Sequence, residues 1–202
     1  IHHTHTNKMK LFLSAAFIAS ASAFAPTAFT GRTSVARDAS IADTIAELQG
    51  PEIFWGSEGV LVGKDEADIK GYDNFSKLAA ALSANGVDLS SGDYTILAPS
   101  DSAFEKHENE VGTPIDGDVL KYHVIPGKKT LDMLTSDQET LQGGTLTSYR
   151  KFRKNWLDFA IVGLKSEGPS KSSNWPADVE ADNGIIHGID TVLVPGAYTG
   201  SR

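Results

Sequence analysis

The chain has 202 residues, of which 40% are hydrophobic and 22% charged, a composition that suits one globular domain with its own core. Its formal net charge of −8 repels phosphate backbones, which argues against a nucleic-acid partner. Because the sequence has no cysteine, disulfides, thiolate nucleophiles and cysteine metal sites are excluded, and an extracellular location is weakly disfavoured.

The first 39 residues are expected to be a leader that precedes the folded domain. Residues 1–8 lie before the first methionine, Met9, and we expect them to be upstream sequence or a cloning scar that the mature protein lacks; the alternative is a flexible metal-binding cluster of His2, His3 and His5. A lysine, the apolar run at residues 11–23 and its small final residues make a signal-peptide pattern. That run is shorter than the roughly 20 residues that a membrane span needs.

The sequence ASAFAP at residues 21–26 resembles the bipartite targeting motif of algae whose complex plastids derive from red algae. In that motif cleavage exposes a phenylalanine, here Phe24, which the import path recognises. Residues 24–39 are rich in Ser, Thr and Arg and hold no acid before Asp38, which is typical of a transit peptide. We therefore predict a plastid protein, stromal or thylakoid-associated; the alternative is a secreted protein.

Residues 40–69 are predicted to form an N-terminal arm. Ser40 is placed to cap a short helix whose apolar face is Ile41, Ile45 and Leu48. The sequence EIFWGSEGVLVG that follows holds a large apolar set among glycines, which either packs on its own domain or docks onto a partner. The residues assigned to this candidate interaction surface are Ile53, Phe54, Trp55 and Leu61.

Helical and extended patterns alternate over residues 75–110. Phe75, Leu78, Ala79 and Leu82 recur at helical spacing, and Asn85-Gly86 supplies a stop. YTILA at residues 94–98 reads as a strand. The next helix begins at Ser100 or at Ser102, and Ser102 with Glu105 matches a capping box.

Strands are predicted to dominate after a short helix at residues 118–124, which begins at Asp118. Gly143-Gly144 and Asn183-Gly184 predict two hairpins. Residues 156–164 read as one strand. Helices early and strands late indicate an α+β fold, with short helices packed on a β-sheet wedge or sandwich.

Four segments, in order, resemble the fasciclin, or FAS1, domain. YTILAPSDSAFEKH (94–107) is similar to its first signature and ADVEADNGIIHGIDTVLVP (177–195) to its second. Between them, LKYHVIPGK (120–128) resembles its tyrosine-histidine segment and TLQGGTLT (140–147) its hairpin. The resemblance implies the FAS1 fold over residues 70–196, followed by a tail at 197–202. It also implies adhesion or protein binding, because FAS1 domains serve mainly as binding modules.

His187 stands alone in the apolar run GIIHGID. On a strand, Ile185, His187 and Ile189 share one face, and Ile186 and Gly188 share the other. Both faces are apolar, so we expect a central strand and a buried ring that bonds to the backbone carbonyl of a neighbouring strand. A catalytic role is the alternative.

Tyr122 and His123 match, as residue types, the segment that is implicated in receptor binding in animal relatives. A core role also explains both, since Leu120, His123 and Val124 share one helical face. Both roles stay open here. His107 is expected near the C-terminus of a helix, as a partner of its dipole.

Motifs that carry catalysis are missing from the sequence. It has no G-x-S-x-G elbow, no H-E-x-x-H and no Gly-rich phosphate loop. The acidic stretch at residues 178–184 departs from a calcium loop in its glycine position and at its twelfth residue. We therefore predict a protein that is not an enzyme, with no catalytic residue, no cofactor and no metal.

A basic run lies in residues 148–176, a segment longer than the compact family pattern. It either meets an acidic protein face or anionic lipid, or is a solvated turn. Phe152 and Trp156 are its candidate anchors. The residues assigned to this surface are Arg150, Lys151, Phe152, Arg153, Lys154 and Trp156.

These features together predict a peripheral accessory subunit that binds a thylakoid photosystem or light-harvesting assembly in a complex plastid. We expect a protein partner, peripheral membrane association and no transmembrane segment in the mature chain. The first alternative is a secreted or cell-surface adhesion or matrix protein, for which the sequon Asn74-Phe75-Ser76 would matter. The other is an enzyme or small-ligand carrier with a cleft near His123 or His187.

Overall fold

The computed structural model describes residues 39–54, 69–151, 154–163 and 175–199. The predicted leader up to residue 38 lies outside these ranges, and of Phe54 only the backbone is described. Four residues of the candidate surfaces also lie outside them: Trp55, Leu61, Phe152 and Arg153. Within the described ranges, no helix has the length and apolar character that crossing a membrane requires.

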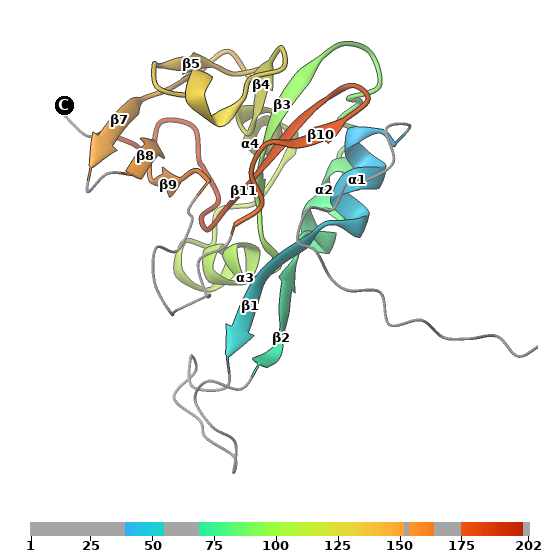
Figure 1. Ribbon diagram of the computed structural model, residues 1–202. Helices are drawn as coiled ribbons and strands as arrows, with labels where there is room; N and C mark the ends of the chain where they lie inside the picture. Colours follow the sequence, from blue (N-terminus) through green and yellow to red (C-terminus); the bar gives the residue numbers. More distant parts are fainter. Residues whose placement is uncertain (1–38, 55–68, 152–153, 164–174, 200–202) are drawn as a thin grey trace, which may run out of the picture. The chain divides into compact units, whose positions relative to one another are not determined.

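A mixed four-stranded sheet lies at the centre of the domain (Figure 1). In spatial order its strands are β10 (Val179–Ala181), β11 (Gly184–Ile189), β3 (Tyr94–Pro99) and β4 (Val124–Pro126). β11 runs parallel to β3, and the two outer pairs are antiparallel. All six residues of β11 are buried, which confirms the predicted central strand.

Helices pack beside this sheet. They are α1 (Ile41–Glu47), α2 (Ser76–Ala84), α3 (Asp101–Glu110), α4 (Gly117–Tyr122) and the 3-10 turn η2 (Leu131–Met133). The predicted cap of α1 is confirmed, because Ser40 Oγ accepts a hydrogen bond of 3.3 Å from the nitrogen of Asp43. The predicted stop of α2 is confirmed too, with Gly86 in the left-handed region at φ 61°.

One predicted helix start is confirmed and another is wrong. Of the two serines left open for α3, Ser100 is the cap, since Ser100 Oγ accepts from the nitrogen of Ala103 at 3.3 Å, and the capping box at Ser102 is not formed. α4 begins after Asp116, whose carboxylate accepts from the nitrogens of Asp118 and Val119, each at 3.0 Å. In both places an earlier side chain already satisfies the first free N–H groups of the helix.

Short sheets complete the domain. They are β1 (Gln49–Phe54) with β2 (Ile69–Asn74), β5 (Gln138–Glu139) with β6 (Thr145–Leu146), and β7 (Ser148–Lys151), β8 (Lys154–Leu157) and β9 (Ala160–Ile161). The single strand predicted at residues 156–164 is wrong, because Asp158 adopts φ 50° and a turn separates β8 from β9. The hairpin around Gly143-Gly144 is confirmed, although residues 140–144 link its strands.

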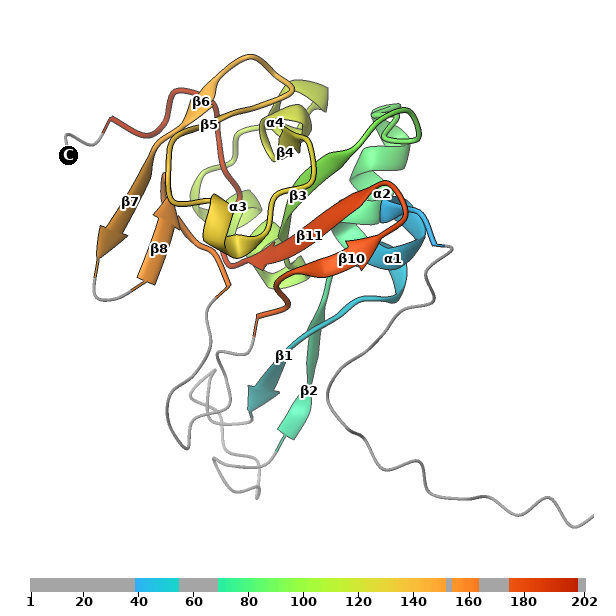
Figure 2. The same ribbon diagram turned by 45° about the horizontal axis from the view of Figure 1, so that its top comes forward.

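Alternation along β3 divides the core between the two faces of the central sheet. Ile96 joins a cluster with residues of α1, α2 and α4, and Leu97 joins a second cluster with residues of the β5–β9 region. Residues of α1 and α2 therefore pack on one face of the central sheet, and residues of β6, β8 and β9 pack on the other. In Figure 2, α1 and α2 lie on one side of β10 and β11, and β7 and β8 lie on the other. This arrangement confirms the predicted α+β class.

The helix predicted in the N-terminal arm packs into the first of these clusters. Ile41 and Ile45 have no exposed surface, and the nitrogen of Ile41 bonds to Asn183 Oδ1 at 2.8 Å. Burying each of these side chains is worth about 1.5–3 kcal/mol. The domain boundary at residue 70 stays a prediction, but the packing shows that α1 shares the core of the domain.

Candidate functional site

His187 is fully buried in β11, and both of its ring nitrogens are bonded. Nδ1 accepts a hydrogen bond of 3.2 Å from the nitrogen of Asp178, so Nε2 carries the proton and donates to the carbonyl of Lys129 at 2.9 Å. Burial lowers the pKa of His187, which keeps the ring neutral at pH 7. The prediction that the ring bonds to a backbone carbonyl is confirmed. The carbonyl, however, belongs to the loop after β4 and not to a neighbouring strand.

His123, at the end of α4, is bonded in the same way. Its Nδ1 donates to the carbonyl of Val119 at 2.8 Å, and its Nε2 accepts from the nitrogen of Leu193 at 2.9 Å. Burial lowers its pKa to about 4. The ring therefore joins α4 to the segment after β11 as a neutral link in the core.

Tyr122 forms a buried pair with Asp158 across the domain. Its hydroxyl donates to Asp158 Oδ2 at 2.8 Å, and the nitrogen of Thr147 donates to Asp158 Oδ1 at 2.7 Å. Burial, and then the bond to the carboxylate, raise the pKa of Tyr122. Tyr122 is 4% exposed and His123 1%, so neither can contact a partner in this conformation.

His107 lies in the last turn of α3, as predicted, and is also buried. Its Nε2 lies 2.9 Å from the carbonyl of Thr113, which fixes the loop after the helix. In the described part of the chain, no three His, Asp or Glu side chains converge in a group that could hold a metal ion.

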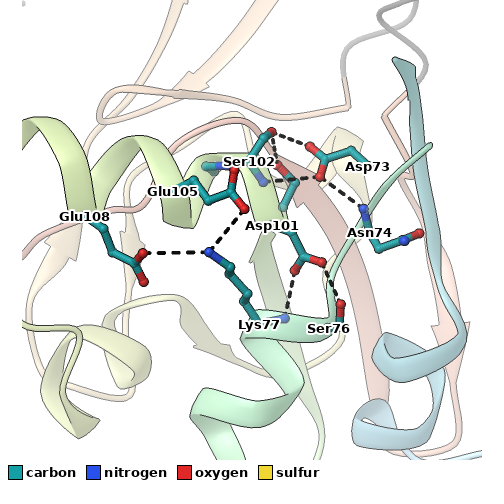
Figure 3. A network of polar contacts seen from close by, with 10 residues as sticks. Asp73, Asn74, Ser76, Lys77, Asp101, Ser102, Glu105 and Glu108 are labelled. Atoms are coloured by element: carbon teal, nitrogen blue, oxygen red, sulfur yellow. Dashed lines mark hydrogen bonds and ion pairs between the residues drawn. The ribbon is translucent and has the colours of Figure 1, made fainter. Parts of the chain in front are cut away.

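A polar cluster joins the starts of α2 and α3 (Figure 3). Asp73 accepts hydrogen bonds from the hydroxyl and, at 3.2 Å, from the nitrogen of Ser102. Asp101 accepts from Ser76 Oγ at 2.6 Å and from the nitrogen of Lys77 at 2.7 Å. These carboxylates satisfy the free N–H groups of two helices, so the cluster has a structural role.

An open pocket of about 530 Å³ lies between α2, α3 and the loop after α3. Much of its lining is apolar, with Ala80, Phe104 and Ile115 among the contributing residues. Lys77 Nζ stands 3.4 Å from the carboxylate of Glu105 and 3.7 Å from that of Glu108. None of the described lining residues is a histidine, so the pocket is not the cleft that the ligand-carrier alternative requires.

The described residues of the two candidate surfaces lie on separate small sheets. Ile53 is partly buried in β1, near the end of the β1–β2 ribbon. On the other sheet, Arg150 and Lys151 are exposed on β7, and β8 contributes exposed Lys154 and partly buried Trp156. The sheet pairs Lys151 with Lys154 across its strands.

Three aromatic residues beside the basic hairpin were missed from the sequence. The ring of Tyr149 stacks on Trp156 with centroids 5.9 Å apart, and on Tyr198 with centroids 6.0 Å apart. Phe159 meets Tyr198 edge to face at 5.1 Å and is 47% exposed. The alternation of β7 and β8 was a signal for the first pair, but nothing in the sequence linked the C-terminal Tyr198 to this face.

The family model of the Fasciclin domain matches residues 73–195, which is more than half of the chain. The chain belongs to the fasciclin (FAS1) family. FAS1 domains are protein-interaction and adhesion modules. The match spans β3, the tyrosine-histidine segment and β11, and it begins after α1 and β1.

Relatives of this FAS1 chain include proteins from animals and bacteria. It is 34% identical over 136 residues to transforming growth factor-beta-induced protein ig-h3 of Sus scrofa, covering 61% of this chain and 18% of that protein. It is 34% identical over 141 residues to protein sll1483 of Synechocystis, covering 62% and 69%. It is 29% identical over 136 residues to cell surface glycolipoprotein MPB83 of Mycobacterium bovis, covering 60% and 56%.

Among solved structures, the FAS1 chain is similar to a FAS1 domain pair from the insect cell adhesion molecule fasciclin I. The TM-score is 0.40 at 21% identity, over 58% of this chain and 44% of that one. The chain thus spans less than a fifth of ig-h3 and less than half of the insect pair.

Proposed function

We propose that this FAS1 protein is a non-enzymatic interaction module of a complex plastid. In this proposal it is a peripheral accessory subunit that binds a thylakoid photosystem or light-harvesting assembly. The observation that carries the non-enzymatic part is the bonding of the histidines: each of the three described rings is buried and bonded to the backbone. In this proposal the imidazoles serve only to complete the core, and the exposed surfaces of the domain bind the partner. The leader at residues 21–39 motivates the plastid address.

The first proposed docking surface is the end of the β1–β2 ribbon, with Ile53 and Phe54; Trp55 and Leu61, also assigned to it from the sequence, lie outside the described ranges. A two-stranded ribbon is marginally stable in water unless it packs on something else. In Figure 1 the ribbon extends away from α1 and α2. Tyr72, on β2, is 42% exposed, so the ribbon offers apolar area to a partner. The basic residues 150–154 with Trp156 are the second candidate surface.

Affinity capture from source plastids tests the partner. A tagged protein is recovered from thylakoids solubilised in mild detergent, and the bound proteins are identified by mass spectrometry. We expect photosystem or antenna subunits with the wild type and their loss with Tyr72→Glu. Met133→Glu is the matched control, because Met133 is a similarly exposed apolar residue outside the ribbon. Recovery of no photosystem or antenna subunit by the wild type would reject the partner.

A fluorescent fusion to residues 9–40 tests the address. Plastid fluorescence is the expected result. Export to the medium would favour the second candidate, a secreted adhesion protein, which the cell-surface description of MPB83 supports. In that case glycosylation at Asn74, which is exposed on β2, is expected as well.

A further inference from the structure

The β7–β9 sheet and the C-terminal segment together build a face of aromatic and basic side chains. Four rings follow one another in contact, in the order Trp156, Tyr149, Tyr198 and Phe159. By strand alternation, exposed Lys154 lies on the same side of the β7–β8 hairpin as Trp156, while exposed Arg150 lies on the other side. We call the following set the aromatic–basic face: Tyr149, Lys154, Trp156, Phe159 and Tyr198.

The charge of this region is opposite to that of the chain. Residues 140–157 hold four Lys and Arg and no Asp or Glu, in a chain of net charge −8. The next acid, Asp158, is buried and bonded to Tyr122 and Thr147, so it adds no exposed negative charge. Asp137 bonds to the nitrogen of Ser148, at the start of β7 and away from the Lys154 end. The hairpin therefore presents positive charge to an anionic ligand.

The polar groups of two rings in the aromatic–basic face are already used within the domain. Tyr149 Oη donates to the carbonyl of Asp158 at 2.9 Å, and Trp156 Nε1 donates to that of Lys151 at 3.3 Å. The rings of Tyr149 and Trp156 therefore offer a ligand apolar surface, but neither has a hydrogen-bond donor left to give. A protein or sugar ligand gains specificity from directional hydrogen bonds, whereas a bilayer interface requires only amphipathic rings and cations.

We propose that the aromatic–basic face binds the surface of an anionic lipid bilayer. Lys154 on this face, and the long side chain of Arg150 from the other side of the same hairpin, would reach the headgroups, with the edges of Trp156 and Phe159 in the interfacial zone. This inference goes beyond the proposed function and requires no photosystem. A vesicle assay contains no protein partner, so the failure of one proposal leaves the other standing.

Vesicle flotation tests the inference. The chain used is residues 34–202, which keeps every described residue and omits the apolar run of the predicted leader, because that run would bind lipid by itself. It is mixed with vesicles of phosphatidylcholine alone, or with roughly one-third phosphatidylglycerol as the anionic lipid. We expect binding to the anionic vesicles, little binding to the neutral ones, and release as salt rises through about 0.5 M.

Two double variants of equal net charge separate the charge of the β7–β8 hairpin from the overall charge of the chain. Arg150→Glu with Lys154→Glu is expected to weaken binding to anionic vesicles by at least about tenfold. Lys106→Glu with Lys121→Glu, on α3 and α4, is expected to bind like the wild type. Phe159→Ser should weaken binding several-fold while the salt dependence is kept. Thermal melts check that each variant is folded.

Several outcomes would overturn the inference. They are no binding to anionic vesicles, equal binding to neutral ones, and equal losses in the two double variants. Unchanged binding by Phe159→Ser would overturn the role of the rings. A further outcome is that the wild type does not bind vesicles but captures proteins from a thylakoid extract, and that the Arg150 and Lys154 variant does not capture them. That result would show that the ligand is an acidic protein and not lipid.

Discussion

Asp101, in the first turn of α3, accepts a hydrogen bond of 2.7 Å from the backbone nitrogen of Lys77 in the first turn of α2 (Figure 3). The residue before α2 is Phe75, whose side chain makes no capping bond, so α3 supplies the acceptor that α2 lacks. Asp73, before α2, accepts in return from the nitrogen of Ser102 in α3. Each helix start thus depends on an acid from outside its own helix.

Asp101→Ala is expected to lower the free energy of unfolding by about 1–2 kcal/mol, because two donors at the start of α2 lose their acceptor. Urea denaturation measures the loss. Glu108→Ala is the control: it removes only an exposed ion pair with Lys77 and should cost less than about 0.5 kcal/mol. Equal losses in the two variants would contradict the capping role.

The lowered pKa of His123 predicts that the folded protein loses stability in mild acid. Its pKa in the folded protein is lowered to about 4 from an ordinary 6.5, so the unfolded chain binds the proton more readily. The free energy of unfolding should therefore fall as the pH drops from 6.5 towards 4, and the lowered pKa of His187 acts in the same direction. Urea titrations over this range measure the slope.

Replacement of His123 measures how much this residue contributes to the pH dependence of the free energy of unfolding. His123→Gln should lower stability at neutral pH by about 1–3 kcal/mol, because the geometry of two buried bonds is lost. Its pH dependence should nevertheless be shallower than that of the wild type. The control is ring NMR of the folded wild type: a His123 signal that titrates near 6.5 would contradict the buried, neutral assignment.

Tyr122→Phe is expected to cost about 1–3 kcal/mol of stability, because it leaves the buried carboxylate of Asp158 without one of its donors. Tyr72→Phe, at an exposed tyrosine, should be close to neutral. Spectrophotometric titration gives a second readout: the raised pKa of Tyr122 means that its phenol stays protonated where free tyrosine ionises. Equal stability of both variants would show that the pair with Asp158 adds nothing.

Gly184→Ala is expected to cost more than about 2 kcal/mol, because a methyl group at the start of β11 would overlap the carbonyl of Tyr94 and press on Ile41. Gly71→Ala, in β2, is the matched control, since nothing lies within 4 Å of its added carbon. Thermal unfolding of both variants measures the difference. A Gly184 variant as stable as the Gly71 variant would mean that β3 and β11 can move apart at little cost.

Local patterns predicted the central elements well. The alternation around His187 and the run at residues 94–98 each identified a strand, because a strand buried on both faces is apolar throughout. The helical spacing at residues 75–82 identified α2, because one face of that helix packs on the core. The buried state of His187 followed from its apolar neighbours alone.

Other features depend on contacts between distant residues and were not predictable in this way. The strand predicted at residues 156–164 is interrupted because Asp158 turns inward to meet Tyr122, which lies 36 positions earlier. The start of α3 at Ser100 was obscured because Ser102 also fits a cap, and Ser102 bonds instead to Asp73. In the aromatic–basic face, Tyr198 reaches Tyr149 only through the fold.

The parallel pairing of β11 with β3 has a consequence for biosynthesis. The register joins Tyr94 to Gly184 and Pro99 to Ile189, so the central sheet closes only after residue 189 has been made, some 90 residues after β3. Pairings between such distant segments form slowly. A nascent chain that still lacks β11 would expose the apolar surface of β3 to chaperones, and a stop codon before residue 189 would yield a polypeptide that is a substrate for degradation.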